Sequence, residues 1–80
     1  MTYTYLLKLE HSCWYVGKTG DLCKRLKAHW RGSGTQWTKK HRPLQLAGLW
    51  EGDQELLVYW ATAETQGQAR TRGAGHTRAD

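Results

Sequence analysis

Two β-rich runs stand only three residues apart near the start of the chain, and this spacing constrains the fold more than any other feature. Along residues 3–9, two tyrosines and two leucines alternate with a second set of side chains, the period-two pattern of a strand. Residues 13–16 (Cys-Trp-Tyr-Val) are again rich in strand-forming types and stop at Gly17. The three residues Glu-His-Ser between them are a tight connection, which favours antiparallel neighbours. The sequence therefore predicts an antiparallel hairpin.

A helix is predicted directly after the hairpin. Residues 22–30 place their apolar side chains on one stripe, while the lysines point away from it. Asp21 is a suitable N-cap, and Gly32 ends the element. After a Gly-rich loop, residues 36–41 are expected to form a short helical turn.

The rest of the chain predicts one more strand, one more helix and a tail. Residues 44–50 indicate a third strand, and Asp53 can cap a second helix over residues 54–66, which contain no Gly or Pro. The order β-β-α-β-α predicts an α+β fold with a small three-stranded antiparallel sheet flanked by helices, a domain over residues 1–66. Residues 67–80 contain Gly and Arg and no large apolar side chain, so we expect a flexible basic tail.

Positive charge is concentrated in one part of the chain. The net charge is +5, yet residues 18–42 carry eight Lys or Arg against a single acid, Asp21. Trp30 and Trp37 stand among these cations, which favours a ligand that offers both phosphates and stackable bases. The alternative for such a run is a solvated basic surface without a specific ligand.

The cysteine count and the hydropathy pattern argue against a secreted or membrane protein. Two cysteines are too few for a disulfide framework, and no apolar run has the length of a signal peptide core or a membrane span. We therefore expect an intracellular, cytoplasmic protein with free thiols and no membrane partner. A zinc site built from Cys13, Cys23, His29 and His41 has poor ligand spacing, because structural zinc sites usually pair ligands two to four residues apart.

Several short motifs occur in an order and spacing that one family shares. They are residues 3–5 (Tyr-Thr-Tyr), residues 15–19 (Tyr-Val-Gly-Lys-Thr), Arg25 with His29, and residues 37–43 (Trp-Thr-Lys-Lys-His-Arg-Pro). This set resembles the GIY-YIG nuclease superfamily, of which the chain would be a stand-alone, single-domain member. Tyr3 and Thr4 stand where Gly and Ile are usual in the first motif, but its essential tyrosine, Tyr5, is in place.

The resemblance implies an endonuclease that hydrolyses DNA phosphodiester bonds. Tyr5 or Tyr15 would help to activate the attacking water, Arg25 would clamp the scissile phosphate, and Lys18 and His29 would assist. One Mg²⁺ or Mn²⁺ ion would be held by a glutamate on the last helix. Nucleic-acid contacts are expected from the basic and aromatic side chains of the central region, namely Lys24, Lys27, Trp37, Lys39, Lys40 and His41.

Each of these residues also has an ordinary structural interpretation. Taken alone, Tyr5 and Tyr15 are typical cross-strand core partners, Arg25 a surface charge, and His29 a neutral helix residue. Their joint order and spacing favours the functional interpretation. Arg25 and His29 stand one helical turn apart, so both side chains can face the hairpin.

The family's metal-binding glutamate is expected at position 61, where this chain has Ala61. Loss of that carboxylate predicts a weakened or inactive enzyme. Three explanations are open: an engineered Glu-to-Ala replacement, a natural nuclease-like binding protein, or Glu64 acting as a displaced ligand on the same helix. Glu55 is expected on another face of that helix and is a poorer substitute.

Two other classes of function compete with the nuclease. One is a nucleic-acid-binding module without a catalytic role, and the other is a small protein-binding domain with a Trp-rich surface. Double-stranded or branched DNA is the expected partner of the nuclease. Because the nuclease fold alone rarely supplies sequence specificity, a dimer or a separate partner is expected to provide it.

Overall fold

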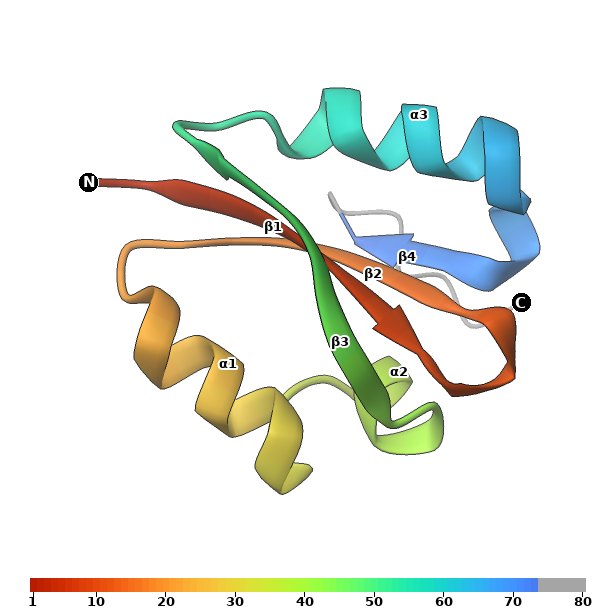
Figure 1. The fold of residues 1–80 in the computed structure, drawn as a ribbon, viewed down its shortest axis with the longest axis horizontal. Helices are drawn as coiled ribbons and strands as arrows, with labels where there is room; N and C mark the ends of the chain where they lie inside the picture. The colour runs from red at the N-terminus through yellow and green to blue at the C-terminus, as the bar shows by residue number, and fades with distance from the viewer. Residues whose placement is uncertain (74–80) are drawn as a thin grey trace.

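The structure is a computed structural model that describes residues 1–73, and a mixed sheet lies at its centre (Figure 1). The described strands are β1 (Tyr3–Leu9), β2 (Trp14–Thr19), β3 (Pro43–Glu51) and β4 (Thr71–Gly73), in the spatial order β3-β1-β2-β4. β1 is antiparallel to β2 and β3, whereas β4 runs parallel to β2. The α+β prediction is confirmed. The sheet of residues 1–73 differs from the expected one because it has four strands and is mixed.

The added strand comes from the segment that was expected to be a flexible tail. Gln68–Arg70 form a 3-10 turn, η2, which leads directly into β4. Thr71 is fully buried, and its hydroxyl donates a 2.9 Å hydrogen bond to the carbonyl of Gly67. The flexible-tail prediction is therefore wrong for residues 68–73, and residues 74–80 lie outside the described part. A strand this short, held mainly by backbone pairing, carries no apolar period that a sequence pattern could reveal.

The predicted hairpin is present and fixes the faces of the sheet. Its strands are joined by the 3-10 turn η1 (Glu10–Ser12), and the register sets Tyr5 opposite Gly17 and Leu7 opposite Tyr15. Directly opposed residues point to the same face of a sheet, so both tyrosines lie on one face. Val16 and Lys18 point to the other face.

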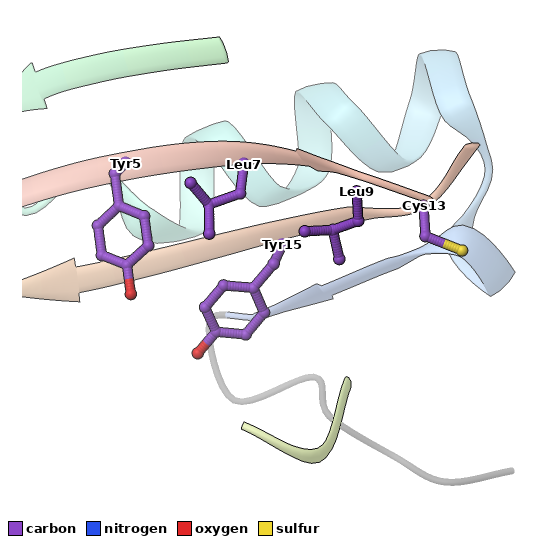
Figure 2. Close-up of a cluster of buried hydrophobic side chains, with 5 residues drawn as sticks. All are labelled: Tyr5, Leu7, Leu9, Cys13 and Tyr15. Carbon is purple, nitrogen blue, oxygen red and sulfur yellow. The ribbon is translucent and has the colours of Figure 1, made fainter. Parts of the chain in front are cut away.

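Helices cover both faces, with α1 (Leu22–Arg31) and α2 (Gln36–Lys40) on one side and α3 (Glu55–Gln66) on the other (Figure 1). The α1-side core is the buried cluster Tyr5, Leu7, Leu9, Cys13 and Tyr15 (Figure 2). Leu22, Leu26 and Trp37 are partly buried against it. The α3-side core consists of Val16, Val58, Tyr59 and Ala63, packed by Leu6. In residues 1–73, no helix is long and apolar enough to cross a bilayer.

The predicted cap of α1 is confirmed, whereas the predicted cap of α3 is wrong. The N-cap of α3 is Gln54, which makes no side-chain cap bond, and the Asp53 carboxylate accepts only the N–H of Glu55, at 3.3 Å. The Asp21 carboxylate accepts the backbone N–H of Lys24 at 3.1 Å, and Gly32 ends α1 in the left-handed region at φ 86°. α2 begins with a capping box, a pair of reciprocal side chain to backbone hydrogen bonds, between Thr35 and Thr38. The prediction of helices after the hairpin and after the third strand is therefore confirmed.

Candidate active site

Tyr5 and Tyr15 form the floor of the site on the α1 side of the sheet. Their ring centroids are 6.2 Å apart, and both hydroxyls are directed to the same side, away from the strands (Figure 2). The Tyr5 ring lies directly over Gly17, where an added Cβ would overlap the phenol. The glycine of the second motif is thus required by the tyrosine of the first motif.

A buried hydrogen-bonded chain leads away from Tyr5. The Tyr5 hydroxyl lies 2.8 Å from Nε2 of His29, and Nδ1 of the same ring lies 3.1 Å from Oγ1 of Thr38. Tyr5, His29 and Thr38 are all fully buried. Gly34 closes this chain from the loop, since a Cβ there would overlap Nδ1 of His29. The three side chains come from β1, α1 and α2, so the packing of both helices on the sheet builds the site.

Arg25 adds the positive charge at this point. Burial raises the pKa of Tyr5 to about 12 and also raises the pKa of Tyr15, although the neighbouring Arg25 guanidinium acts in the opposite direction on both. Burial, and next the charge of Arg25, lower the pKa of His29 to about 4. At neutral pH the site therefore holds two phenols, a neutral imidazole and a guanidinium.

Lys18, in contrast, lies on the face of the sheet opposite the two tyrosines. Its Nζ atom is 3.1 Å from Oδ2 of Asp53 and 3.9 Å from Oε1 of Glu55. The hydrogen bond to Asp53 raises the pKa of Lys18, and the same contact lowers the pKa of Asp53. Both side chains are exposed, so this ion pair is weak. Its effect is to hold Lys18 at the start of α3.

Glu55, the first residue of α3, is half-buried and lies beside Lys18. Its charge contributes to raising the pKa of both Tyr5 and Tyr15. Thr4 anchors the turn before α3. The buried Thr4 hydroxyl accepts the N–H of Gln54 and donates to the carbonyl of Gly52, both at 2.8 Å. A residue that departs from the family motif thus fixes where α3 begins.

The two positions that the sequence assigned to a metal ion, 61 and 64, do not lie with the tyrosines. Ala61 and Glu64 are both exposed on α3, the helix that packs on the face opposite the tyrosines. Among residues 1–73, no group of three or more His, Cys, Asp or Glu side chains is arranged to hold a metal ion. The four proposed zinc ligands do not gather either, since Cys13 is buried, Cys23 is exposed, and His29 bonds Tyr5 and Thr38.

The residues expected to contact nucleic acid fall into two groups. Lys24 and Lys27 on α1 and Lys39 and Lys40 on α2 are exposed on the helices that flank the tyrosines. Trp37 instead packs inside the protein. Its indole N–H donates to the carbonyl of Trp14 at 2.9 Å, and the Arg72 guanidinium lies 4.3 Å from its ring centroid.

His41 is the remaining member of that predicted set, and it also has contacts within the protein. Its Nδ1 atom lies 2.9 Å from Nδ1 of His11, and its ring packs against Trp37 with 4.4 Å between centroids. Together these rings tie α2 to the hairpin turn.

The sequence interpretation missed three residues of the site. Thr38 stood inside the Trp-Thr-Lys-Lys segment, but that segment gave no reason to select it. Gly34 belonged to a loop described only as Gly-rich. Glu55 was set aside because its place on the helix was judged from spacing, which does not reveal where a helix begins relative to the sheet.

The fold and the site together define a nuclease-type domain. The family model of the GIY-YIG catalytic domain matches residues 1–72, and the chain belongs to this family, as the motifs predicted. The match also includes most of β4.

Several curated relatives are UPF0213 proteins. The chain is 45% identical to YazA of Bacillus subtilis (strain 168) over 42 residues, which cover 52% of this chain and 42% of YazA. It is 33% identical to CPE1444 of Clostridium perfringens (strain 13 / Type A) over 72 residues, which cover 90% of this chain and 66% of that relative. The chain thus spans less than two thirds of the length of either relative. No solved structure matches the chain significantly.

Proposed function

We propose that this chain is a metal-dependent endonuclease domain that hydrolyses phosphodiester bonds of double-stranded or branched DNA, with activity weakened by Ala61. The observation that carries the proposal is the convergence of two phenols and one guanidinium on a single point beside a buried, neutral His29. A core that needed only to be packed would not bury this many polar atoms. Phosphodiester hydrolysis needs these groups, a proton acceptor for water and a fixed cation for the phosphate.

Each residue has a definite part in that reaction. Arg25 binds the non-bridging oxygens of the scissile phosphate and stabilises the charge that develops on them. The Tyr5 oxygen accepts a proton from the attacking water while its own proton passes to Nε2 of His29, 2.8 Å away. The new P–O bond forms as the bond to the leaving 3′ oxygen breaks, and solvent protonates that oxygen. His29 then returns its proton to Tyr5, which releases one to solvent, so both groups regain their starting states. Tyr15 holds Arg25 in place, and Lys18 contributes positive charge near α3.

The donor set admits one hydrated ion. Mg²⁺ in nuclease sites keeps several waters and uses one or two carboxylates together with substrate phosphates. Glu55, half-buried at the start of α3, can supply one such carboxylate, whereas Ala61 supplies none and Glu64 is exposed on α3. When bound, the ion would stabilise charge on the phosphate and on the leaving oxygen. Because Glu55 is also within 3.9 Å of Lys18, we expect the ion to bind weakly.

The DNA is proposed to lie across α1 and α2, where the exposed lysines follow the same face as the tyrosines. Lys24, Lys27, Lys39 and Lys40 would contact phosphates, which positions the duplex without reading its sequence. Selectivity would then come from a second copy or a separate partner. A cytoplasmic location, inferred from the sequence, is part of the same proposal.

Cleavage assays with substitutions on one helix test this function. Supercoiled plasmid and branched and single-stranded oligonucleotides are incubated with Mg²⁺ or Mn²⁺, and with chelator. We expect slow, metal-dependent cutting by the unchanged chain, faster cutting by Ala61→Glu, and loss of cutting in Glu55→Gln. Glu64→Gln is the matched control and should cut like the unchanged chain. Cutting that survives both chelator and Glu55→Gln would contradict the metal assignment.

A second function is favoured by one specific observation. Ala61 offers no ligand, and residues 1–73 contain no group of three or more candidate metal ligands. A nucleic-acid-binding module of nuclease-like fold is consistent with this. If no variant, including Ala61→Glu, cuts any substrate while all bind DNA with a salt-dependent affinity, the binding module replaces the nuclease.

A further inference from the structure

Thr38 is a residue to which the proposed reaction assigns no part. Its side chain is fully buried beside His29, with Oγ1 3.1 Å from Nδ1 of the ring. The opposite ring nitrogen, Nε2, lies 2.8 Å from the Tyr5 hydroxyl. A neutral imidazole carries one donor and one acceptor, so the partner of one nitrogen decides what the other nitrogen can do.

The surroundings of Thr38 favour one arrangement of protons. Its Oγ1 accepts the backbone N–H of Thr35 at 3.1 Å and can donate to the Thr35 carbonyl at 3.2 Å. The Thr35 hydroxyl is a further partner, 3.2 Å from Thr38 Oγ1. When the Thr38 hydrogen goes to the carbonyl or the hydroxyl of Thr35, one lone pair of Thr38 remains for an N–H donor. Nδ1 of His29 lies where that donor is needed.

The contacts of Tyr5, at the other end of the hydrogen-bonded series, agree with this arrangement. The Arg25 guanidinium, which can only donate, lies against the Tyr5 oxygen and raises its own pKa through that contact. The Tyr5 hydroxyl then needs an acceptor for its proton, and an unprotonated Nε2 supplies one. In this arrangement the hydroxyl protons of Tyr5 and Thr38 and the ring proton of His29 each have an acceptor.

We propose that Thr38 is a positioning residue that holds His29 as the Nδ1–H tautomer, so that Nε2 is kept free to accept the proton of Tyr5. Without the Thr38 hydroxyl, the ring can carry its proton on Nε2 and donate to Tyr5. The Tyr5 proton would then point into the site, and its oxygen would no longer be free to accept a proton from water. This consequence for the reaction rests on the proposed function, whereas the tautomer does not.

Gly34 is the second observation that favours the contact between Thr38 and His29. The loop that carries it passes so close that a Cβ would overlap Nδ1 of His29 and lie 3.0 Å from Oγ1 of Thr38. Backbone therefore covers the contact and keeps water from replacing the hydroxyl as the partner of Nδ1. In a site closed in this way, the loss of one hydroxyl is not repaired by solvent.

Nitrogen NMR of the His29 ring tests the inference without any assay of activity. The unchanged chain, labelled with ¹⁵N-histidine and held at neutral pH, should show a protonated Nδ1 and an unprotonated Nε2. Thr38→Ser, which keeps the hydroxyl, should show the same pattern, and Thr38→Val should move the proton wholly or partly to Nε2. A protonated Nε2 in the unchanged chain, or an unchanged tautomer in Thr38→Val, would overturn the proposal.

A matched variant separates this effect from the capping role of Thr38. Thr35→Ala removes the side-chain oxygen at the other end of the same capping box and leaves the Thr38 hydroxyl in place. It should destabilise α2 as Thr38→Val does and yet leave the His29 tautomer unchanged. A tautomer shift in Thr35→Ala equal to that in Thr38→Val would show that the cap, and not the hydroxyl, controls the ring.

Cleavage kinetics then connect the tautomer to the reaction. Thr38→Val should lower kcat at least about tenfold with little change in KM, and Thr38→Ser should restore most of it. If Thr38→Val shifts the tautomer but the unchanged chain cuts no DNA, the role of Thr38 is upheld and the proposed nuclease is rejected. Unchanged kcat in a Thr38→Val chain with a shifted tautomer would remove Thr38 from the reaction and leave the nuclease standing.

Discussion

The two faces of the sheet bury comparable numbers of side chains but differ in their chemistry. On the α3 side, Val16, Val58 and Ala63 pack around Tyr59, and the buried polar side chains include those of Thr4 and Thr62. On the α1 side, the same sheet buries two tyrosines, and His29 and Thr38 lie fully buried beside them. A buried polar atom without a partner costs about 1–3 kcal/mol, so a chain assembled only for stability would avoid this risk. The α1 side thus concentrates the phenols and the imidazole that the proposed reaction uses.

Two glycines lie where side chains of the site approach the backbone closely. Gly17 and Gly34 are both forced by side chains of the α1 side, the first by the Tyr5 ring and the second by His29. Neither has a positive φ, so neither is needed for a turn. They are needed because aromatic rings of the site approach the backbone closely. The glycine of the second motif is therefore required by a side chain of the site and not by a turn.

Among the substitutions on the two faces, replacing Arg25 is expected to have the largest effect on cleavage relative to its effect on stability. Arg25→Ala removes the cation beside both phenols, so cleavage should fall at least about 100-fold, as when one electrostatic donor is removed from a transition state. The free energy of unfolding should change little, because the residue is only partly buried. Plasmid nicking and thermal unfolding measure the two quantities. Arg31→Ala, on the exposed side of α1, is the control and should cut normally. Full activity in Arg25→Ala would place the site elsewhere.

Acid is expected to destabilise the α1 side selectively. The pKa of His29 is about 4 in the folded chain and near 6.5 in an unfolded one, so the unfolded state takes up the proton first. Stability is therefore complete above about pH 6.5 and declines as the pH falls towards 4, by up to about 3 kcal/mol. Urea unfolding between pH 7 and pH 4 measures the slope.

A substitution at each face sharpens that measurement. His29→Gln should flatten the pH dependence, whereas Val58→Ala on the α3 side should shift the whole curve without changing its slope. An equal slope in the unchanged chain and in His29→Gln would assign the acid sensitivity to other groups.

The α3 side should respond to a core substitution as a structural element only. Val58→Ala removes two methyl groups from the cluster around Val16 and should lower the free energy of unfolding by about 1–3 kcal/mol. The rate of cleavage per folded molecule should stay the same, because the sheet separates this cluster from Tyr5 and Arg25. Denaturant unfolding and cleavage well below the unfolding transition test both statements. A fall in kcat at full occupancy of the folded state would show that the faces are coupled.

The sequence predicted the elements better than it predicted the site, and the reasons are physical. The hairpin, α1 and α3 follow from local periods and caps, which the chain carries in residues close together. β4 was missed because it is three residues long and depends on pairing with a strand more than fifty residues away. Such a partner leaves no local pattern.

The site shows the same limit at the level of single residues. Tyr5, Tyr15, Arg25 and His29 were selected together from motif order, and the structure brings their side chains together. Glu55 and Thr38 were not selected, because their roles depend on where α3 starts and on how α2 packs over the His29 ring. Spacing along a chain fixes a residue's place on its helix, but it does not fix the place of the helix on the sheet.

Trp37 provides the last and smallest test, because its predicted and observed surroundings differ. As a base-stacking residue it would lose DNA affinity on substitution, by about 1–3 kcal/mol for one stacked base. In the structure its indole N–H is bonded to the Trp14 carbonyl and its ring is covered by Arg72 and His41. Trp37→Phe should therefore lower the free energy of unfolding by about 1 kcal/mol, through one lost hydrogen bond, and leave DNA affinity unchanged. Lys39→Ala is the counterpart on the surface: it should leave stability unchanged and reduce the slope of log affinity against log salt by about 0.9. Weakened DNA binding in a fully folded Trp37→Phe chain would show that Trp37 contacts DNA, as the sequence predicted. The binding surface of the α1 side would then include this partly buried residue.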